Sequence, residues 1–329
     1  MSEDPDLLIN DRWIVSKRGR KNSVDPQKPY AWLVEKERTV SGEIEDVATI
    51  FLTNRECPFR CLMCDLWKNT TDKSLPSGAI PNQIEWAMNH LPYVKHLKLY
   101  NSGSFFDGRA IAEEDYKRIA SLVSSFETVI VESHPDMISD KCLIFRDMLK
   151  PDLHLAIGLE TVQPEILKKL NKQMTLEDFR NSVSFLTKHG ILSRAFVLLR
   201  PPFVTKSEGI YWAERSLDFA FSTGVECCTV IPVRAGNGAM DMLLEEGHFA
   251  PPDIHSLETV LEYGIKLNAG RVFADVWDVG MFSSCDKCID QRTNRLIAMN
   301  LSQKIHGQIK CTCTHPPDPI AINIIFLSH

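Results

Sequence analysis

The feature that most constrains the fold of this chain is a regular alternation of short apolar segments with amphipathic segments between residues 47 and 268. The apolar segments predict buried strands, and the segments between them have the apolar spacing of helices. Strands that alternate with helices form a parallel sheet with right-handed crossovers. The predicted strands cover residues 47–53, 96–100, 128–132, 153–157, 191–199 and 226–232.

The helical segments start and stop at residues that favour helix ends. Thr175 is placed to cap a helix that runs to His189, and Gly190 follows that helix. Six strand–helix units fall short of the eight of a closed barrel. We therefore predict an α/β fold built on a partial (β/α)6 TIM-like barrel. The predicted helices cover residues 81–91, 113–126, 139–149, 175–189, 207–223 and 255–268.

The length of the chain, 329 residues, leaves room for additions at both ends of such a barrel. We expect an N-terminal extension over residues 1–44, a core domain over 45–270 and a small Cys-rich C-terminal region over 271–329. In barrels of this kind the reactive groups lie at the carboxyl ends of the strands. The loops that directly follow predicted strands are therefore where we expect the chemistry.

Composition and charge indicate a cytoplasmic globular protein. Hydrophobic residues make up 44% of the chain, and the net charge of −6 disfavours a broad basic surface for nucleic acid. The acidic N-terminus lacks the pattern of a secretory signal, and no stretch of about 18 apolar residues predicts a membrane span. In a reducing cytoplasm, the ten cysteines are expected to be ligands or buried thiols, not disulfides.

A loop with three cysteines directly follows the first predicted strand. Cys57, Cys61 and Cys64 are spaced as C-x3-C-x2-C. Three thiolates are one short of the four ligands that an ordinary iron–sulfur cluster takes, so one iron of a four-iron cluster would stay open to bind another molecule. The alternatives are a zinc site, with Asp65 as a fourth ligand, or three unrelated buried thiols. The spacing and the strand-then-loop position favour the cluster.

Polar residues also follow other predicted strands. Asn101, Ser102 and Gly103 follow the second strand, Glu160 ends the fourth and Arg200 ends the fifth. A carboxylate at a strand end can bind hydroxyls or an ammonium group, and a guanidinium can bind a carboxylate through two hydrogen bonds. The structural alternatives are a polar turn, an acidic residue at a helix start and a surface salt bridge.

A cysteine loop of this spacing after the first strand of a six-unit barrel resembles the radical S-adenosylmethionine (SAM) superfamily. The resemblance implies a [4Fe–4S] cluster on Cys57, Cys61 and Cys64, with SAM on the open iron. One electron from the cluster would cleave SAM to a 5′-deoxyadenosyl radical, which abstracts hydrogen from an unidentified substrate. An electron donor such as a reductase, flavodoxin or ferredoxin is implied as well.

The same resemblance assigns the SAM contacts. Met63 stands where the superfamily often has an aromatic residue, and it offers an apolar contact to adenine. The loop over 101–103 corresponds to a Gly-Gly-Glu stretch of which one glycine remains, so this match is partial. The SAM contacts implied in this way are Met63, Asn101, Ser102, Gly103, Glu160 and Arg200.

Longer stretches narrow the resemblance to the elongator catalytic-subunit group, and within it to the radical SAM subunit of archaeosine synthase. These stretches are Ile157–Thr161, Glu165–Asn171, Thr175–Phe179, Gly236–Met240 and Glu245–Pro252. The resemblance implies a transfer RNA (tRNA) substrate, with a small molecule as the other substrate class.

A tRNA substrate would need a basic face on a chain of negative net charge. The residues that we expect to form it are Lys17–Lys21 together with Lys168, Lys169 and Lys172.

A second cysteine set lies in the C-terminal region. Cys285 and Cys288, with Cys311 and Cys313, offer four thiolates, and His315 is a spare ligand. Four sulfurs suit a zinc ion or a fully ligated auxiliary cluster, and the alternative is a group of reduced structural cysteines. A non-catalytic interaction module that binds zinc through both cysteine sets is an alternative function. The remaining three cysteines, Cys142, Cys227 and Cys228, are predicted to lie in the core.

Overall fold

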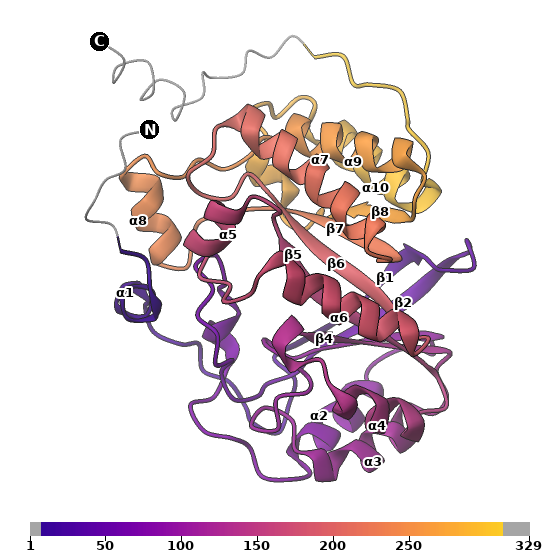
Figure 1. Cartoon of the computed structure of the whole chain (residues 1–329). Helices are drawn as coiled ribbons and strands as arrows, with labels where there is room; N and C mark the ends of the chain where they lie inside the picture. The colour runs from indigo at the N-terminus through magenta and orange to yellow at the C-terminus, as the bar shows by residue number, and fades with distance from the viewer. Residues whose placement is uncertain (1–7, 312–329) are drawn as a thin grey trace.

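The computed structural model describes residues 8–311 as one curled sheet of eight strands with helices along its outer face (Figure 1). The strands follow one another in chain order from β1 at one edge to β8 at the other. β1 runs antiparallel to β2, and every later pair of neighbours is parallel. The strands are β1 (Ala31–Arg38), β2 (Ile44–Phe51), β3 (His96–Tyr100), β4 (Thr128–Ser133), β5 (Asp152–Glu160), β6 (Leu192–Leu199), β7 (Cys227–Pro232) and β8 (Arg271–Ala274).

The predicted fold class is confirmed. Strands β2 to β7 are the six predicted strands, and the partial barrel that they form is α/β. The sheet is also wider than predicted, because β1 from the N-terminal segment and β8 after residue 270 extend its two edges. β1 escaped prediction because its sequence, AWLVEKER, places charged residues where a core strand ordinarily has apolar ones.

Helices follow the strands as the alternation predicted. In Figure 1, α2, α3 and α4 lie together beside the first half of the sheet, and α7, α9 and α10 lie together beside the second half. The α-helices are α1 (Asp11–Lys17), α2 (Ala79–Met88), α3 (Tyr116–Leu122), α4 (Asp140–Met148), α5 (Pro164–Lys169), α6 (Leu176–Lys188), α7 (Lys206–Ser222), α8 (Ala239–Glu245), α9 (Ile254–Leu267) and α10 (Ile289–Ser302). The shorter 3-10 helices are η1 (Leu66–Asn69), η2 (Glu113–Asp115), η3 (Pro135–Met137) and η4 (Val279–Phe282).

The predicted cap of α6 is confirmed in its geometry. The Thr175 side chain accepts a hydrogen bond from the backbone of Asp178, and the Asp178 carboxylate accepts one from the backbone of Thr175. These two bonds satisfy donors that a helix start leaves open. Gly190 then takes the left-handed conformation, φ +70°, which lets the chain turn from α6 into β6.

The core lies between the sheet and its helices in two main clusters. One packs β2, β3 and β4 against α2 to α4, with Leu99 and Phe145 fully buried. The other packs β5 to β8 against α6, α7, α9 and α10. Cys142, Cys227 and Cys228 are buried, as predicted.

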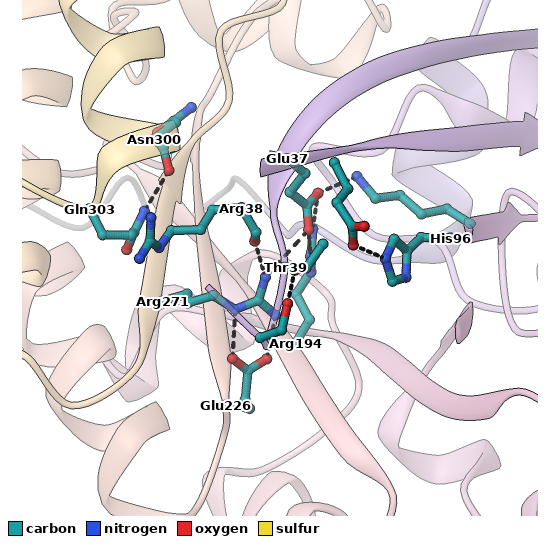
Figure 2. A network of polar contacts seen from close by, with 12 residues as sticks. Glu37, Arg38, Thr39, His96, Arg194, Glu226, Arg271, Asn300 and Gln303 are labelled. Atoms are coloured by element: carbon teal, nitrogen blue, oxygen red, sulfur yellow. Dashed lines mark hydrogen bonds and ion pairs between the residues drawn. The ribbon is translucent and has the colours of Figure 1, made fainter. Parts of the chain in front are cut away.

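The open edge of β8 is covered by side chains of α10. The Gln303 amide, just after α10, accepts from the backbone N–H of Val272 and donates to its carbonyl, both at 2.8 Å. The Asn300 amide does the same with Ala274, again at 2.8 Å. Two amides thus occupy the hydrogen-bonding positions of a neighbouring strand, and they keep this edge from pairing with another chain. Figure 2 shows the side chains of Asn300 and Gln303.

A buried ion network closes the barrel near the amino-terminal ends of its strands (Figure 2). Glu37 of β1 contacts Lys98 of β3 at 2.6 Å, Arg194 of β6 and, at 3.7 Å, Arg271 of β8. Burial alone would raise the pKa of Glu37, but the charges of Arg194 and Lys98 outweigh it and hold that pKa well below its ordinary value. The antiparallel strand β1 therefore binds to strands from both halves of the sheet through one carboxylate.

Each helix within residues 8–311 is too short or too polar to traverse a lipid bilayer.

Candidate functional site

The three-cysteine loop leaves the carboxyl end of β2, where the backbone N–H of Leu52 still bonds to the Tyr100 carbonyl at 2.7 Å. Cys57, Cys61 and Cys64 are free, half-buried thiols. Burial raises the pKa of Cys57 and Cys64 to about 12 and that of Cys61 to about 11. A ligand that takes thiolates must therefore displace three protons from this loop.

The three sulfurs of this loop are more widely spaced than the ligands of one ion. Among the described residues, three cysteines in the C-terminal region have sulfurs that all lie within 4.8 Å of one another, and Cys57, Cys61 and Cys64 do not. In a four-iron cluster each thiolate binds its own iron, so the sulfurs stand further apart than they do around one ion. The spacing of Cys57, Cys61 and Cys64 suits the larger group.

Asn237, in the loop after β7, holds the cysteine loop by its backbone. Its side-chain amide donates to the carbonyls of Leu62, at 2.7 Å, and Cys64, at 3.1 Å. Its amide oxygen accepts from the backbone N–H of Met240 at 2.7 Å. The neighbouring Gly238, with φ +87°, allows this arrangement, because a Cβ there would lie 1.9 Å from the carbonyl oxygen of Lys17.

The loop after α5 holds the cysteine loop from another side. The backbone N–H of Leu62 donates to the Leu170 carbonyl at 2.9 Å. The Asn171 amide donates to the Arg60 carbonyl at 2.8 Å and to the carboxylate of Asp11 at 2.7 Å. The path of the cysteine loop is thus fixed by segments that follow β5 and β7.

The residues after β3 lie against the first cysteine. A Cβ on Gly103 would stand 3.2 Å from the Cβ of Cys57, so the glycine backbone packs directly against that residue. Ser102 adopts a left-handed conformation with φ +53°, and its hydroxyl lies 3.3 Å from the Tyr30 hydroxyl. Asn101 is fully buried, and its side-chain amide has no hydrogen-bond partner among the described residues. A buried amide without a partner favours a ligand that supplies one.

Glu132, at the end of β4, shapes this loop. Its carboxylate accepts from the backbone N–H groups of Asn101, at 2.5 Å, and Gly103, at 3.5 Å. Burial raises the pKa of Glu132 to about 7, although these backbone bonds oppose the shift. The polar loop predicted from the sequence is therefore built around an acidic residue of the next strand.

Glu160 forms a buried ion pair with Lys172. The Lys172 ammonium lies 2.7 Å from the Glu160 carboxylate, and both side chains are buried. The register between β5 and β6 shifts between Gly158 and Glu160, and Glu160 has φ +65°. A Cβ on Gly158 would lie 2.2 Å from the carboxylate and 2.4 Å from the ammonium. Bulge and glycine together make room for the pair.

Lys172 also acts on the cysteine loop electrostatically. Its charge lowers the pKa values of Cys57 and Cys61, against the larger effect of burial. The placement corrects one prediction: Lys172 was expected on a basic face, but the structure buries it in this pair. A lone lysine in a polar loop gives no sequence signal for such burial.

His134 links Lys172 to the cysteine loop. Its Nε2 lies 2.9 Å from the Lys172 carbonyl, and its ring stacks on Phe59 with the ring centroids 3.7 Å apart. Burial lowers the pKa of His134 to about 3, so the ring is neutral near pH 7. A neutral ring can donate from Nε2 and accept the Asp136 N–H at Nδ1.

The other two predicted SAM contacts lie in different surroundings. Met63 packs against the apolar cluster that includes Ile166 and Leu170. Arg200 is buried, has φ +56° and donates to the Pro251 carbonyl at 3.0 Å. Their roles toward SAM stay predictions.

Three residues that hold the site were not assigned to it from the sequence: Lys172, His134 and Asn237. Asn237 lies within Gly236–Met240, a stretch already noted for its resemblance to a known family. Two glycines around one amide residue are a usable signal, because they indicate a tight turn that aims a side chain.

The second cysteine set is built by other elements. Cys285 and Cys288 lie between η4 and α10, and Cys311 follows α10. The sulfurs of these three residues lie within 4.8 Å of one another. Cys313 and His315 fall outside the described residues.

No protein-family model matches the chain. The chain is 26% identical over 339 residues to an uncharacterized protein of Methanocaldococcus jannaschii, covering 93% of this chain and 92% of that one. It is 24% identical over 242 residues to archaeosine synthase subunit beta of Thermococcus kodakarensis, covering 70% and 74% of the two chains. The predicted resemblance to the archaeosine synthase subunit is thereby confirmed.

Two solved structures that the chain resembles belong to longer proteins. One is the radical S-adenosylmethionine methyltransferase TsrM of Kitasatospora setae, with a TM-score of 0.47 and 16% identity over 61% of this chain and 39% of TsrM. The other is the archaeal Elp3 of Methanocaldococcus infernus, with a TM-score of 0.48 and 16% identity over 59% and 50% of the two chains. This chain thus spans half or less of either structure.

Proposed function

We propose that this chain is a radical SAM enzyme in which Cys57, Cys61 and Cys64 hold a [4Fe–4S] cluster and the open iron binds SAM. The observation that carries the proposal is the cysteine loop itself. It offers three free thiols at the carboxyl ends of the barrel strands, spaced more widely than the ligands of one ion. Contacts from the segments after β5 and β7 hold its backbone in place.

The surrounding residues fit the group. Asn101 presents a buried amide that lacks a partner among the described residues, and Gly103 brings its backbone against Cys57. When bound, the cluster supplies one electron that cleaves SAM to a 5′-deoxyadenosyl radical for hydrogen abstraction from the substrate. A reductase, flavodoxin or ferredoxin as the electron donor is part of the same proposal.

The chain's own residues hold the loops of the site in place and balance the charge of the thiolates. Glu132 fixes the loop over 101–103 that we assign to SAM, through the backbone N–H groups of Asn101 and Gly103. Lys172 offsets the negative charge of thiolates at Cys57 and Cys61, and Glu160 keeps that lysine in place. His134 and Phe59 pack a neutral aromatic stack against the cysteine loop.

Anaerobic purification and reconstitution test the proposal. We expect a brown protein that forms 5′-deoxyadenosine from SAM with dithionite, and a colourless, inactive Cys57→Ala/Cys61→Ala/Cys64→Ala variant. Cys142→Ala, which removes a buried core thiol, is the matched control and should stay brown. A wild-type protein that stays colourless after reconstitution would overturn the proposal.

For the substrate, we propose tRNA, with a small molecule as the alternative. The similarity to archaeosine synthase subunit beta supports the tRNA. The basic face for it is smaller than the sequence suggested, because Lys172 is buried and both Arg18 and Lys21 pair with Glu56.

Retention of tRNA at increasing salt separates the two substrate classes. Phosphate contacts make such binding weaken steeply as salt rises. We expect binding at low salt that is lost between about 50 and 200 mM. A complete lack of retention at low salt would exclude tRNA and leave a small molecule.

A further inference from the structure

The sulfurs of the second cysteine set come together from separate parts of the chain. Cys285 and Cys311 are 26 residues apart in the chain, yet their sulfurs lie 3.5 Å from each other. The Cys288 sulfur lies within 4.8 Å of both. Cys285 and Cys288 are free thiols.

The first half of the set is a tight turn at the start of α10. The Cys288 backbone N–H bonds to the Cys285 carbonyl at 3.4 Å, and the Cys285 N–H bonds to the Ser283 hydroxyl at 3.2 Å. Cys288 then stands at the N-cap position of α10. The turn points two sulfurs to one side and ties their positions to a fourteen-residue helix.

The second half is a segment that runs back along α10. The Arg295 guanidinium donates to the carbonyls of His306, at 2.7 Å, and Gly307, at 2.9 Å. Arg292 donates to the Ile309 carbonyl at 3.4 Å. Two buried arginines therefore guide the chain toward Cys311.

Acidic residues of α9 hold the two arginines in turn. Glu258 pairs with both Arg292 and Arg295, and Glu262 pairs with Arg295 at 2.6 Å. Arg292 also hydrogen-bonds the Cys288 thiol, so a positive charge stands beside the sulfurs. The site is thus assembled by α9, α10 and the returning segment, apart from the loop of Cys57, Cys61 and Cys64.

The sulfur spacing decides between one ion and a cluster. With zinc–sulfur bonds of about 2.3 Å, a tetrahedral ion separates its sulfurs by about 3.8 Å. The separation of 3.5 Å between Cys285 and Cys311 is close to that value. Three sulfurs this near to one another are too close to bind three different irons of a cluster.

We propose that Cys285, Cys288 and Cys311 bind a single structural zinc ion that fastens the chain after α10 to the start of that helix. The ion would anchor α10, whose far end protects the edge of β8 through Asn300 and Gln303. The positive charge of Arg292 would offset the net negative charge of zinc with three thiolates.

Metal analysis in a cluster-free background tests the proposal. In the Cys57→Ala/Cys61→Ala/Cys64→Ala variant, purified from zinc-containing medium, we expect about one zinc and no iron per chain. Adding Cys288→Ser should remove the zinc, whereas adding Cys142→Ala should leave it. Iron in place of zinc, an absence of metal, or zinc that survives Cys288→Ser would each overturn the proposal.

Hydrogen exchange gives a readout that does not depend on how well the variants fold. Stripping zinc from the otherwise intact protein with a chelator should speed exchange at the amides of residues 304–311 at least tenfold. Exchange in β4 and β5 should be unchanged. Equal exchange before and after chelation would overturn the fastening role. Both experiments are independent of SAM cleavage, so they can succeed or fail separately from the proposed function.

Discussion

Replacing Asn237 with alanine tests how the cysteine loop is held. The substitution removes the donor for the Leu62 and Cys64 carbonyls and the acceptor for the Met240 N–H. A buried polar group that loses its partner costs about 1–3 kcal/mol. The bond to the Leu62 carbonyl is buried and the one to the Cys64 carbonyl is partly buried, so we expect a total loss of about 2–4 kcal/mol.

Two measurements on the same preparation check the size and the place of this effect. Urea unfolding of the metal-free protein gives the free energy of unfolding, and iron per chain after reconstitution reports the state of the loop. Asn237→Asp keeps the acceptor for Met240 and loses only the donors, so it should lower iron content as well. Asn82→Ala, which removes an exposed amide, is the control. Unchanged iron content in Asn237→Ala, with unfolding within about 0.5 kcal/mol of wild type, would refute the role of Asn237.

Two further predictions concern the groups around the loop. Lys172→Met leaves Glu160 buried without its partner and should lower the free energy of unfolding in urea by about 3–5 kcal/mol. The double variant Lys172→Met/Glu160→Gln should recover more than half of this loss. Additive losses from the two substitutions would contradict the pairing. Burial lowers the pKa of His134 to about 3, so between pH 6.5 and 3 the unfolded chain binds a proton that the folded protein does not, and stability falls as pH falls. His134→Gln should remove that loss, so between pH 7 and 5 its free energy of unfolding should improve by about 2 kcal/mol relative to wild type. An equal pH dependence of unfolding in both proteins would speak against a buried neutral ring.

The sequence predicted those parts of the protein that depend on neighbouring residues. Apolar runs marked β2 to β7, and the position of Cys57 to Cys64 after β2 located the loop at the carboxyl ends of the strands. Thr175 and Gly190 marked the ends of α6 because caps are local hydrogen-bonding events.

The parts that the sequence did not predict depend on distant partners. Lys172 is buried because Glu160 lies in a bulge beside Gly158, and no local pattern reports that pairing. Asn237 acts on carbonyls 173 and 175 residues earlier in the chain. β1 carries Glu35 and Glu37 toward Lys98, so its inward face is charged where the usual pattern for a strand expects apolar residues.

The carboxylate of Glu37 has a consequence for the order in which the protein folds. Glu37 is 61 residues from Lys98 and 157 residues from Arg194 along the chain. Contacts of such separation form slowly, because a long loop must be closed before they form. β1 leaves the ribosome early but has only β2 as a neighbour, and a two-stranded hairpin is marginally stable alone. We infer that this strand, although made early, is among the last elements to become stable, after β6 and β8 have been synthesised.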